Sequence, residues 1–425
     1  MQQWKISKET TKMIALGLIK RIEVDYGTPF YLMYPNIFRE NVRAFKGAFE
    51  KYYDKVLVGY SFKTNYVPAI SGLAREEGCY AEVVSSMEYK MASRIGFDAK
   101  KIIFNGPVKT TEDIFFALNE GSIVNLDSQY EVDSLLSYKK QNPSKEVKIG
   151  LRINIQLNDP NGKSVIQAGL KIGRFGFSSQ HLEEVIPLLK ENNITINSLH
   201  GHTSSSDRSI ENYLIIAGEL LRVAKRFSLS NVEYFNIGGG FFGAAAEGID
   251  VEGKPSYSDY ASSITSFLCD DEWFIKQKPT IVIEPGVSVV ANVFSFVTKI
   301  YQHKTVRDKH FIIVDGSVFD VKPSMHKYNL PFSLLNVDAG TETRKITTDV
   351  VGSTCMEKDI ILSQVELTAP KKGDYIILHG VGAYTHVLTP TFINYVSPIF
   401  ALENANIRLI RRRQSLNDIF NLFDV

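Results

Sequence analysis

The sequence predicts an α/β protein made of a TIM-like (β/α)8 barrel and a mostly β domain. Eight short β-branched runs alternate with longer amphipathic segments over about 230 residues, the count and span of such a barrel. Each run is continuous and rich in β-branched residues, as strands buried on both faces tend to be. The runs are 56–62, 80–85, 102–105, 122–127, 147–153, 196–201, 232–237 and 280–284.

Helical periodicity fills most of the gaps between these runs. The predicted helices are 67–77, 86–95, 110–119, 128–140, 179–191 and 208–227. Two connections look like long loops, 154–178 after the fifth strand and 241–272 after the seventh.

The two ends of the chain are predicted to form the β-rich domain together. A strand at 28–34 precedes the barrel, and several β-rich runs follow residue 290. These runs are 293–300, 310–314, 361–367, 374–379 and 406–412. We therefore expect a barrel over 36–288 and a β-rich domain made of 1–35 and 289–425.

Charge and composition exclude several classes of function. The 425 residues contain 48 Lys plus Arg against 47 Asp plus Glu, a net charge of +1, so we expect no nucleic-acid or membrane partner. The basic run 408–413 alternates with apolar residues and is typical of a strand with one solvated face. No segment has the length of a transmembrane helix or the pattern of a signal peptide. Three cysteines fit a reducing, cytoplasmic compartment.

Chemically active side chains or glycines follow almost every predicted barrel strand. Barrel enzymes build their active sites at the carboxyl ends of the strands, so we expect these residues to converge. In chain order they are Lys63, Glu82, Asn105, Asp127, Arg152, His200, His202, Gly238, Gly239, Gly240 and Glu284.

Each feature also has a simpler interpretation. Lys63 follows the apolar Phe62, which favours a desolvated amine capable of Schiff-base chemistry over a solvated loop lysine. The glycine tract 238–240 fits either a turn or a phosphate site of the kind that follows the last strands of barrels. His200 and His202 lack a third ligand at a suitable spacing, so we expect no metal. Glu284 is either a capped turn or a carboxylate that faces a cation such as a protonated pyridine nitrogen.

Together these motifs resemble the fold-type III pyridoxal-phosphate decarboxylases, the group of diaminopimelate, ornithine and carboxynorspermidine decarboxylases. The resemblance runs from about residue 25 to the C-terminal RLIRRRQSLNDIF and includes YSFKTN, HGH, GGG, EPG, GSTCMEKD and GAY. It implies a barrel of the alanine-racemase type, pyridoxal 5'-phosphate as cofactor and an amino acid as substrate. It also implies a homodimer with shared active sites.

The resemblance also implies a role for each matching residue. Lys63 binds the cofactor covalently, His202 stacks on its ring and Glu284 pairs with its ring nitrogen. Cys355 reaches the active site of the partner subunit and protonates the product carbon. Without the resemblance, a small buried apolar residue is the less favoured alternative for Cys355. The cofactor phosphate and its surroundings are assigned to Ser205, Gly238, Gly239, Gly240, Gly286, Tyr384, Glu82, Glu88 and Arg152.

Departures from the family pattern bear on the substrate. The family Arg after EPG is Val287 here, and the acidic residue after the catalytic cysteine is Met356. The Arg before Pro in diaminopimelate enzymes is Lys322, and the usual Asp of the second strand is Glu82. The residues expected near the substrate are Lys322, Met356, Glu357, Asp359 and Tyr384.

These departures predict an amino acid with an atypical far end. Burying an unpaired distal ammonium costs several kcal/mol, so we expect a modified or uncharged distal group, or an acid that pairs with Lys322. In the family an acidic residue after the cysteine binds the distal ammonium of the substrate; here Met356 stands in its place, and Glu357 is an alternative carboxylate for that role. Two alternatives to a decarboxylase stay open: an inactive regulatory or binding homologue, and a racemase, against which Glu284 argues.

Overall fold

The barrel and the β-rich part form two compact units. The computed structural model describes residues 8–243, 252–338, 344–368, 370–404 and 406–424. Among these residues, one unit contains 38–243 and 252–290, and the other contains 8–37 and 291–424. No helix within the described ranges is both long and apolar enough to cross a membrane.

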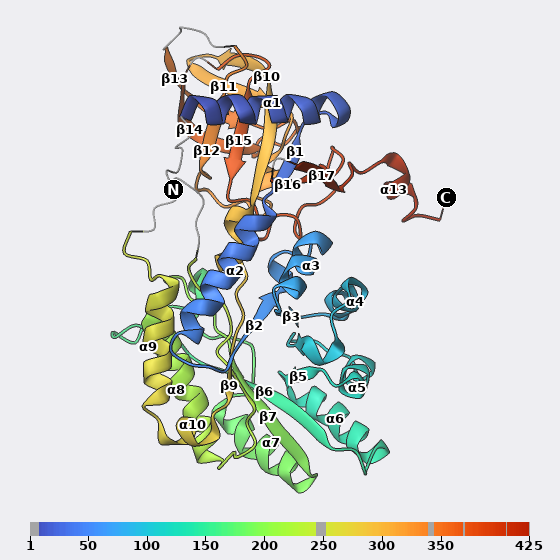
Figure 1. Ribbon diagram of the computed structural model, residues 1–425, viewed down its shortest axis with the longest axis vertical. Helices are drawn as coiled ribbons and strands as arrows, with labels where there is room; N and C mark the ends of the chain where they lie inside the picture. Colours follow the sequence, from blue (N-terminus) through green and yellow to red (C-terminus); the bar gives the residue numbers. More distant parts are fainter. Residues whose placement is uncertain (1–7, 244–251, 339–343, 369, 405, 425) are drawn as a thin grey trace. The chain divides into compact units, whose positions relative to one another are not determined.

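Eight parallel strands close into a barrel in their chain order. Figure 1 shows several of them inside the surrounding helices. The strands are β2 (Val56–Ser61), β3 (Tyr80–Val83), β4 (Ile102–Phe104), β5 (Ile123–Leu126), β6 (Val147–Ile153), β7 (Ile194–Gly201), β8 (Tyr234–Asn236) and β9 (Thr280–Ile283). All eight predicted strands are confirmed, each within two residues of the expected bounds.

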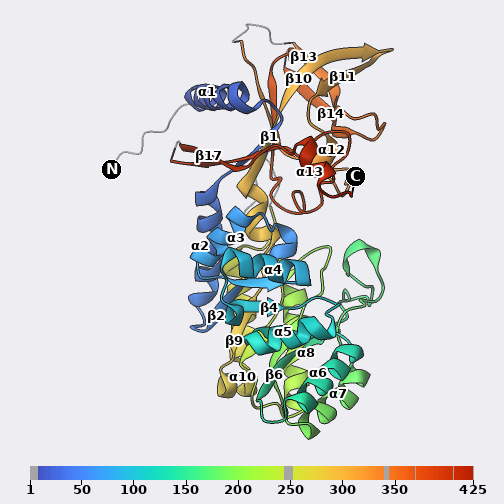
Figure 2. The same cartoon turned by 90° about the vertical axis from the view of Figure 1, so that its right-hand side faces the viewer.

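Amphipathic helices connect the strands and cover the outside of the barrel (Figure 2). They are α2 (Pro35–Glu50), α3 (Pro68–Glu76), α4 (Ser86–Ile95), α5 (Thr111–Glu120), α6 (Gln129–Gln141), α7 (Ser179–Glu191), α8 (Ile210–Arg226), α9 (Tyr257–Cys269), α10 (Glu272–Gln277) and α11 (Val287–Val290). Short 3-10 turns lie at Phe62–Thr64, Ala99–Lys101, Gln167–Gly169 and Ala291–Val293.

Side chains that point inward fill the barrel. Leu57, Ile103, Ile123 and Val282 come from four different strands and form one buried cluster. Gly150 on β6 leaves room for a polar neighbour, because a Cβ at this position would lie 1.7 Å from Asn125 Oδ1. The barrel is therefore filled by apolar side chains in this cluster and admits polar side chains where a strand offers a glycine.

The second unit contains a nine-stranded sheet within the described residues. Its main path runs β14-β13-β11-β10-β1-β16-β17, while β15 pairs with both β10 and β12. The strands are β1 (Phe30–Met33), β10 (Phe294–Val306), β11 (Lys309–Val314), β12 (Phe332–Leu335), β13 (Lys345–Val351), β14 (Ile360–Thr368), β15 (Tyr375–His379), β16 (Ile399–Glu403) and β17 (Asn406–Arg411). The unit also contains the short helices α12 (Val318–Val321) and α13 (Leu416–Phe420).

The N-terminal segment belongs to this sheet. Strand β1 lies between β10 and β16, antiparallel to the first and parallel to the second. Helix α1 (Lys8–Tyr26) lies along the sheet, and its Ile19 and Ile22 share one buried cluster with Phe30 and Phe400 (Figures 1 and 2). Both ends of the chain thus contribute to one core.

Some elements were not predicted from the sequence. The expected loop 241–272 contains α9, whose start has a capping box formed by Ser256 and Asp259. Residues 244–251 of that loop lie outside the described residues. Strands β12, β13 and β16 were missed, because none of them is a long apolar run. The predicted loop 154–178 is confirmed: it contains the 3-10 turn at Gln167–Gly169 and a few isolated β-bridges, and no named helix or strand besides.

Candidate active site

A cavity of about 580 Å³ opens at the carboxyl ends of the barrel strands. Its polar lining includes Lys63, Glu82, Asn105, Arg152, His200, His202 and Glu284, which follow or end six different strands. Its apolar lining includes Ile155, Ile166, Leu170, Ile172 and Phe175 from the loop after β6. The barrel therefore brings together five of the residues expected at the site: Lys63, Glu82, Arg152, His202 and Glu284.

Lys63 lies in a 3-10 turn directly after β2 and forms an ion pair with a buried carboxylate. Its Nζ is 2.5 Å from Glu82 Oε2, and Ser61 Oγ donates to the same oxygen at 2.6 Å. The Lys63 side chain is 32% exposed, whereas that of Glu82 is 1% exposed. The ion pair thus holds the amine at the edge of the cavity, where a bound molecule can reach it.

Asn105 connects the two buried carboxylates of the cavity. Its Nδ2 donates to Glu82 Oε1 at 3.0 Å and to Glu284 Oε1 at 2.8 Å. Asn125 Nδ2 in turn donates to Asn105 Oδ1 at 2.8 Å, which fixes the orientation of the amide. Asn236 Nδ2 donates to Glu284 Oε1 at 2.6 Å.

Glu284 is kept ionised by this surrounding. Burial alone would raise the pKa of its carboxyl group, but His200 and Lys63 outweigh burial, and the pKa lies well below its ordinary value. His200 Nε2 is 3.4 Å from Glu284 Oε2, although it lacks the alignment of a hydrogen bond. A buried, ionised carboxylate with one oxygen toward the cavity lining suits a cationic ring nitrogen.

His202 is held neutral and oriented by the glycine tract. Its Nδ1 accepts a hydrogen bond from the backbone N–H of Gly239 at 2.9 Å. Burial, together with the charges of Lys63 and Arg152, lowers the pKa of its imidazole well below the ordinary value. The imidazole is therefore uncharged, and a neutral aromatic ring of this kind can stack on an aromatic cofactor.

The glycine tract Gly238–Gly240 follows β8 and permits close contact with neighbouring segments. A Cβ at Gly239 would lie 2.1 Å from the carbonyl oxygen of Glu284. Gly238 and Gly240 have φ values of 73° and 93°, in the left-handed region that glycine adopts readily. Glycine turns of this kind can hold a phosphate on backbone N–H groups. In this structure the N–H of Gly238 is donated to Asn236 Oδ1 and that of Gly239 to His202 Nδ1, both at 2.9 Å, so phosphate binding by the tract stays a prediction.

Arg152 lies near the end of β6 and lines the cavity. Its Nη1 is 3.3 Å from Asp127 Oδ1, and its Nη2 donates to the carbonyl of His202 at 3.1 Å. Its guanidinium lies 4.6 Å from the ring centre of Phe175. The buried Nε of Arg152 has no hydrogen-bond partner within the described residues.

Two expected cofactor residues lie beside the cavity lining. The Oγ of Ser205 accepts the backbone N–H of Arg208 at 3.0 Å. Gly286 packs against the 3-10 turn of Lys63, since a Cβ there would lie 2.2 Å from Thr64 Oγ1. A contact of either residue with a cofactor stays a prediction.

The remaining expected residues lie in the β-rich unit. Cys355, Met356 and Glu357 form the turn between β13 and β14, with the Cys355 side chain exposed and in no disulfide. Asp359 is 3% exposed, and its carboxylate accepts hydrogen bonds from Val318 N at 2.6 Å and from the Thr354 N–H and Oγ at 3.0 and 2.6 Å. Asp359 thus ties the cysteine turn to α12, and its direct contact with substrate stays a prediction.

Helix α12 leads directly into Lys322, which is 3% exposed. Burial lowers the pKa of its amine, and no hydrogen bond or ion pair of this amine lies within the described residues. Tyr384 is 42% exposed and has a φ of 53°. Because a buried amine needs a partner of opposite charge, we interpret Lys322 as a group that binds an anion.

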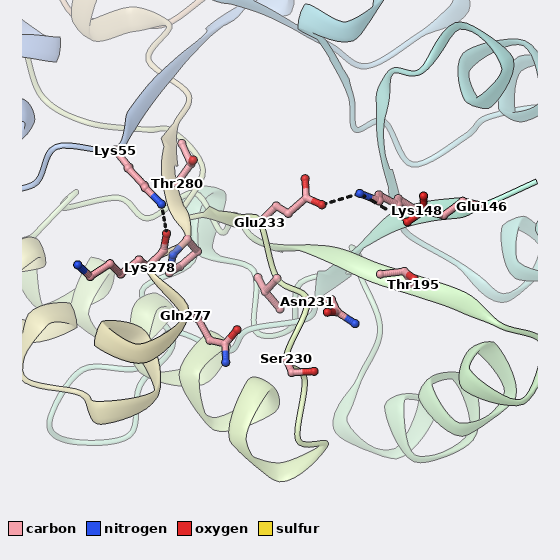
Figure 3. A pocket seen from close by; sticks show the side chains of 12 residues that line it. Lys55, Glu146, Lys148, Thr195, Ser230, Asn231, Glu233, Gln277, Lys278 and Thr280 are labelled. Atoms are coloured by element: carbon pink, nitrogen blue, oxygen red, sulfur yellow. Dashed lines mark hydrogen bonds and ion pairs between the residues drawn. The ribbon is translucent and has the colours of Figure 1, made fainter.

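A second hollow lies at the opposite end of the barrel strands and has a different character. Its volume is about 490 Å³, and it is lined by residues at the starts of strands, including Lys55, Glu233 and Thr280 (Figure 3). Its polar groups pair with one another, as in the 2.8 Å ion pair between Lys148 and Glu233. This end is the one that barrel enzymes use for stability rather than catalysis.

Sequence reasoning gave no role to several residues that line the cavity, as Asn105 and His200 do, or that contact its lining, as Asp127 and Asn236 do. Asn105, Asp127 and His200 were recognised only as strand-end residues, and Asn236 was not singled out. The signal was present in their positions, because all four lie at the carboxyl ends of barrel strands. No cluster of three potential metal ligands occurs in the described part of the chain.

Comparisons with known proteins identify the family. Residues 38–291 match the sequence model of the pyridoxal-dependent decarboxylases, pyridoxal binding domain. A probable chloroplastic diaminopimelate decarboxylase of Oryza sativa subsp. japonica is 31% identical over 409 residues, covering 93% of this chain and 80% of that protein. The diaminopimelate decarboxylase of Aquifex aeolicus is 26% identical over 407 residues, covering 94% and 93%.

A solved structure agrees with these matches. The crystal structure of diaminopimelate decarboxylase from Helicobacter pylori complexed with L-lysine has a TM-score of 0.81 and 26% identity, covering 95% of this chain and 98% of that one. The chain therefore belongs to the pyridoxal-dependent decarboxylases. It is a carboxy-lyase that uses pyridoxal 5'-phosphate, acts on an amino acid and is similar to the diaminopimelate decarboxylases.

The residues present fit this cofactor. The cavity offers an amine at its edge, an ionised carboxylate for a ring nitrogen and a neutral imidazole plate. Two buried polar atoms near these residues, Arg152 Nε and Asn125 Oδ1, have no hydrogen-bond partner within the described residues. Lys63, His202, Arg152 and Glu284 are accordingly the residues that would hold the cofactor.

Glu88 gives a first testable prediction about this region. Burial raises the pKa of its carboxyl group to about 7 from the ordinary 4.5, although it accepts the Val84 N–H at 2.8 Å. The folded state therefore binds this proton more tightly than the unfolded state does. Stability must fall as pH rises from about 4.5 to 7, by about 3 kcal/mol from this group.

The substitution Glu88→Gln mimics the protonated form and should remove this loss. Urea unfolding should find Glu88→Gln more stable than wild type by about 3 kcal/mol at pH 8, and by much less at pH 5. The exposed Glu112, changed to Gln, serves as a control and should show no such pH-dependent difference. A stability difference that is the same at both pH values would contradict the raised pKa.

Proposed function

We propose that this enzyme removes the α-carboxylate of an amino acid whose distal end carries no free ammonium. The observation that supports decarboxylation most directly is the buried, ionised Glu284, held by Asn105 and Asn236. A carboxylate at this position keeps a pyridine nitrogen protonated. When bound, the cofactor supplies an electron sink for the electron pair that remains after carbon dioxide leaves.

The residues of the barrel then have distinct tasks. Lys63 attaches the cofactor through Nζ, and Glu82 fixes this amine by the ion pair at 2.5 Å. His202 would stack on the cofactor ring as a neutral imidazole, and Arg152 fixes the backbone of His202 by donating to its carbonyl oxygen. Phosphate binding is assigned to Ser205 and Gly238–Gly240, and Tyr384 is proposed to assist it.

Cys355 of a second copy of the chain is proposed as the acid. The Cα–carboxylate bond breaks, carbon dioxide departs, and the thiol proton replaces the lost carboxylate on Cα. The exposed Cys355 side chain, in a turn fixed by Asp359, supports a role outside its own unit's core. The enzyme is accordingly proposed to be a homodimer in which each active site uses both copies.

The substrate proposal rests on where carboxylates are missing. The carboxylates among the described cavity-lining residues, Glu82 and Glu284, are both engaged by lysine or amide donors. Met356 takes the place of the acidic residue expected after Cys355. A distal ammonium would therefore be buried without a partner, whereas Lys322 offers a cation to a distal acid.

Free diaminopimelate is the second candidate substrate, because the relatives are named as its decarboxylases. Its distal carboxylate could pair with Lys322. Its distal ammonium would need a carboxylate such as Glu357, which is exposed in the cysteine turn.

The role of Lys63 can be tested with the purified protein. The protein should be yellow, with absorbance near ~420 nm, and borohydride should fix the cofactor on the peptide that contains Lys63. Lys63→Ala should lose the label and turnover, whereas Lys55→Ala, at the opposite end of the barrel, should keep both. Normal cofactor binding and turnover by Lys63→Ala would refute the assignment.

The shared active site can be tested by mixing two inactive variants. One site of a Lys63→Ala and Cys355→Ala heterodimer has both residues intact, so random mixing should restore about a quarter of wild-type activity. Subunit exchange must be verified independently, for example with two tags. If exchange occurs and activity does not return, Cys355 does not act in the partner's site.

The substrate proposal can be tested at Met356. Met356→Glu restores a carboxylate for a distal ammonium, and one charge-assisted hydrogen bond corresponds to a roughly ten- to hundredfold change. The ratio of kcat/KM for diaminopimelate over the preferred substrate should rise by that factor, and Met356→Gln controls for size. A wild-type enzyme that is already efficient on free diaminopimelate would refute the proposal.

A further inference from the structure

A buried ion pair lies in the barrel wall just below the cavity lining. Lys109 Nζ is 2.9 Å from Glu131 Oε1, and both side chains are 0% exposed. Lys109 lies between β4 and α5, and Glu131 lies in the first turn of α6. Neither residue lines the cavity, and the roles proposed above use neither of them.

The pair is saturated with hydrogen bonds to the two neighbouring loops. Lys109 Nζ also donates to the carbonyl oxygens of Asn105 at 2.8 Å and Gly106 at 2.7 Å. Glu131 Oε2 accepts the backbone N–H of Asp127 at 2.6 Å. The pair therefore fixes the backbone at the ends of β4 and β5.

Stability alone does not account for such a pair. Taking both charges out of water costs several kcal/mol, and apolar residues of similar volume are often as stable or more so. Burial lowers the pKa of Lys109 and raises that of Glu131, and the opposite charge of the partner counteracts each shift. What the pair supplies, and apolar residues could not, is directional bonds to three backbone groups.

Those backbone groups belong to residues of the active site. The side chain of Asn105 bridges Glu82 and Glu284, which face Lys63 and the proposed ring nitrogen. The side chain of Asp127 pairs with Arg152, which reaches the His202 carbonyl. A shift of either loop would thus be transmitted to both sides of the cavity.

We propose that Lys109 and Glu131 are positioning residues that fix Asn105 and Asp127, and thereby set the cofactor-binding geometry of the barrel. This inference rests on the proposed cofactor site around Lys63 and Glu284. The cofactor site would then require the directional hydrogen bonds of Lys109 and Glu131, and not merely side chains that fill the same volume.

The double variant Lys109→Met/Glu131→Leu tests whether the site requires the hydrogen bonds of this pair or only its buried volume. It keeps apolar volume and leaves no unpaired buried charge, so the barrel should fold. Titration of the apoprotein with pyridoxal phosphate should show about tenfold weaker binding, and hydrogen exchange at 105–109 and Asp127 should be faster. Cofactor affinity equal to wild type would overturn the proposal.

Two controls distinguish positioning from general loss of stability. Leu135→Ala removes a 0% exposed side chain from the next turn of α6 and should lower the melting temperature without weakening cofactor binding. Tyr130→Phe is a milder probe. The Tyr130 hydroxyl accepts a hydrogen bond from the backbone N–H of Lys109 at 3.0 Å and donates one to Glu131 Oε1 at 3.1 Å. This substitution should weaken binding about threefold even if the double variant does not fold.

A double-mutant cycle with Asn105→Ala tests whether the pair acts through Asn105. If it does, adding Lys109→Met/Glu131→Leu or Tyr130→Phe to Asn105→Ala should weaken cofactor binding little further. Independent, additive effects would overturn the proposal. Lys63→Ala is measured in parallel: normal affinity there refutes the cofactor site itself, whereas weak affinity there with an unaffected pair variant refutes only the positioning role.

Discussion

The architecture of the site depends on satisfying two carboxylates that are buried inside a barrel. Glu82 and Glu284 are almost completely buried, and charges in such places require partners. One amide, that of Asn105, satisfies an oxygen on each of them, and Lys63 and Asn236 supply further donors. The strand ends must therefore be positioned closely enough for a single side chain to bridge β3 and β9. The asparagines, the glycine of β6 and the ion pair behind β4 all serve this one requirement.

Carboxylates also organise the loops by accepting backbone N–H groups. Glu88 accepts the N–H of Val84, Glu131 accepts that of Asp127, and Asp359 accepts those of Val318 and Thr354. Buried backbone donors need such acceptors where regular structure ends. The three cases differ in their counter-charges: Glu131 is paired with Lys109, whereas burial leaves Glu88 with a pKa of about 7. A buried carboxylate that accepts a backbone N–H therefore has a charged partner at Glu131, whereas at Glu88 the carboxyl group titrates near neutral pH.

The barrel was predictable because its strands are short runs rich in β-branched residues that alternate with helical segments. The positions of Lys63, Glu82, Arg152, His202 and Glu284 at strand ends followed from those runs. The bridging role of Asn105 was not predictable, because it depends on which strands become neighbours when β2 and β9 close the barrel. Lys109 and Glu131 were missed for a related reason. Each looks like a solvated charge beside a helix start, and only the fold shows that both are buried. Strands β12, β13 and β16 depend on pairing within the sheet rather than on local pattern.

The glycine tract links the closure of the barrel to the chemistry at its mouth. At Gly239 the backbone passes so close to Glu284 that a methyl group would overlap the carbonyl oxygen, and the same N–H orients His202. A substitution there would disturb the seam between β8 and β9 at the same time as the imidazole. We therefore expect that laboratory evolution of a new specificity would not yield variants with a larger residue at Gly239. Variation is accommodated more easily at exposed positions of the loop after β6, such as Leu170 and Ile172, whose side chains line the cavity and are more than half exposed.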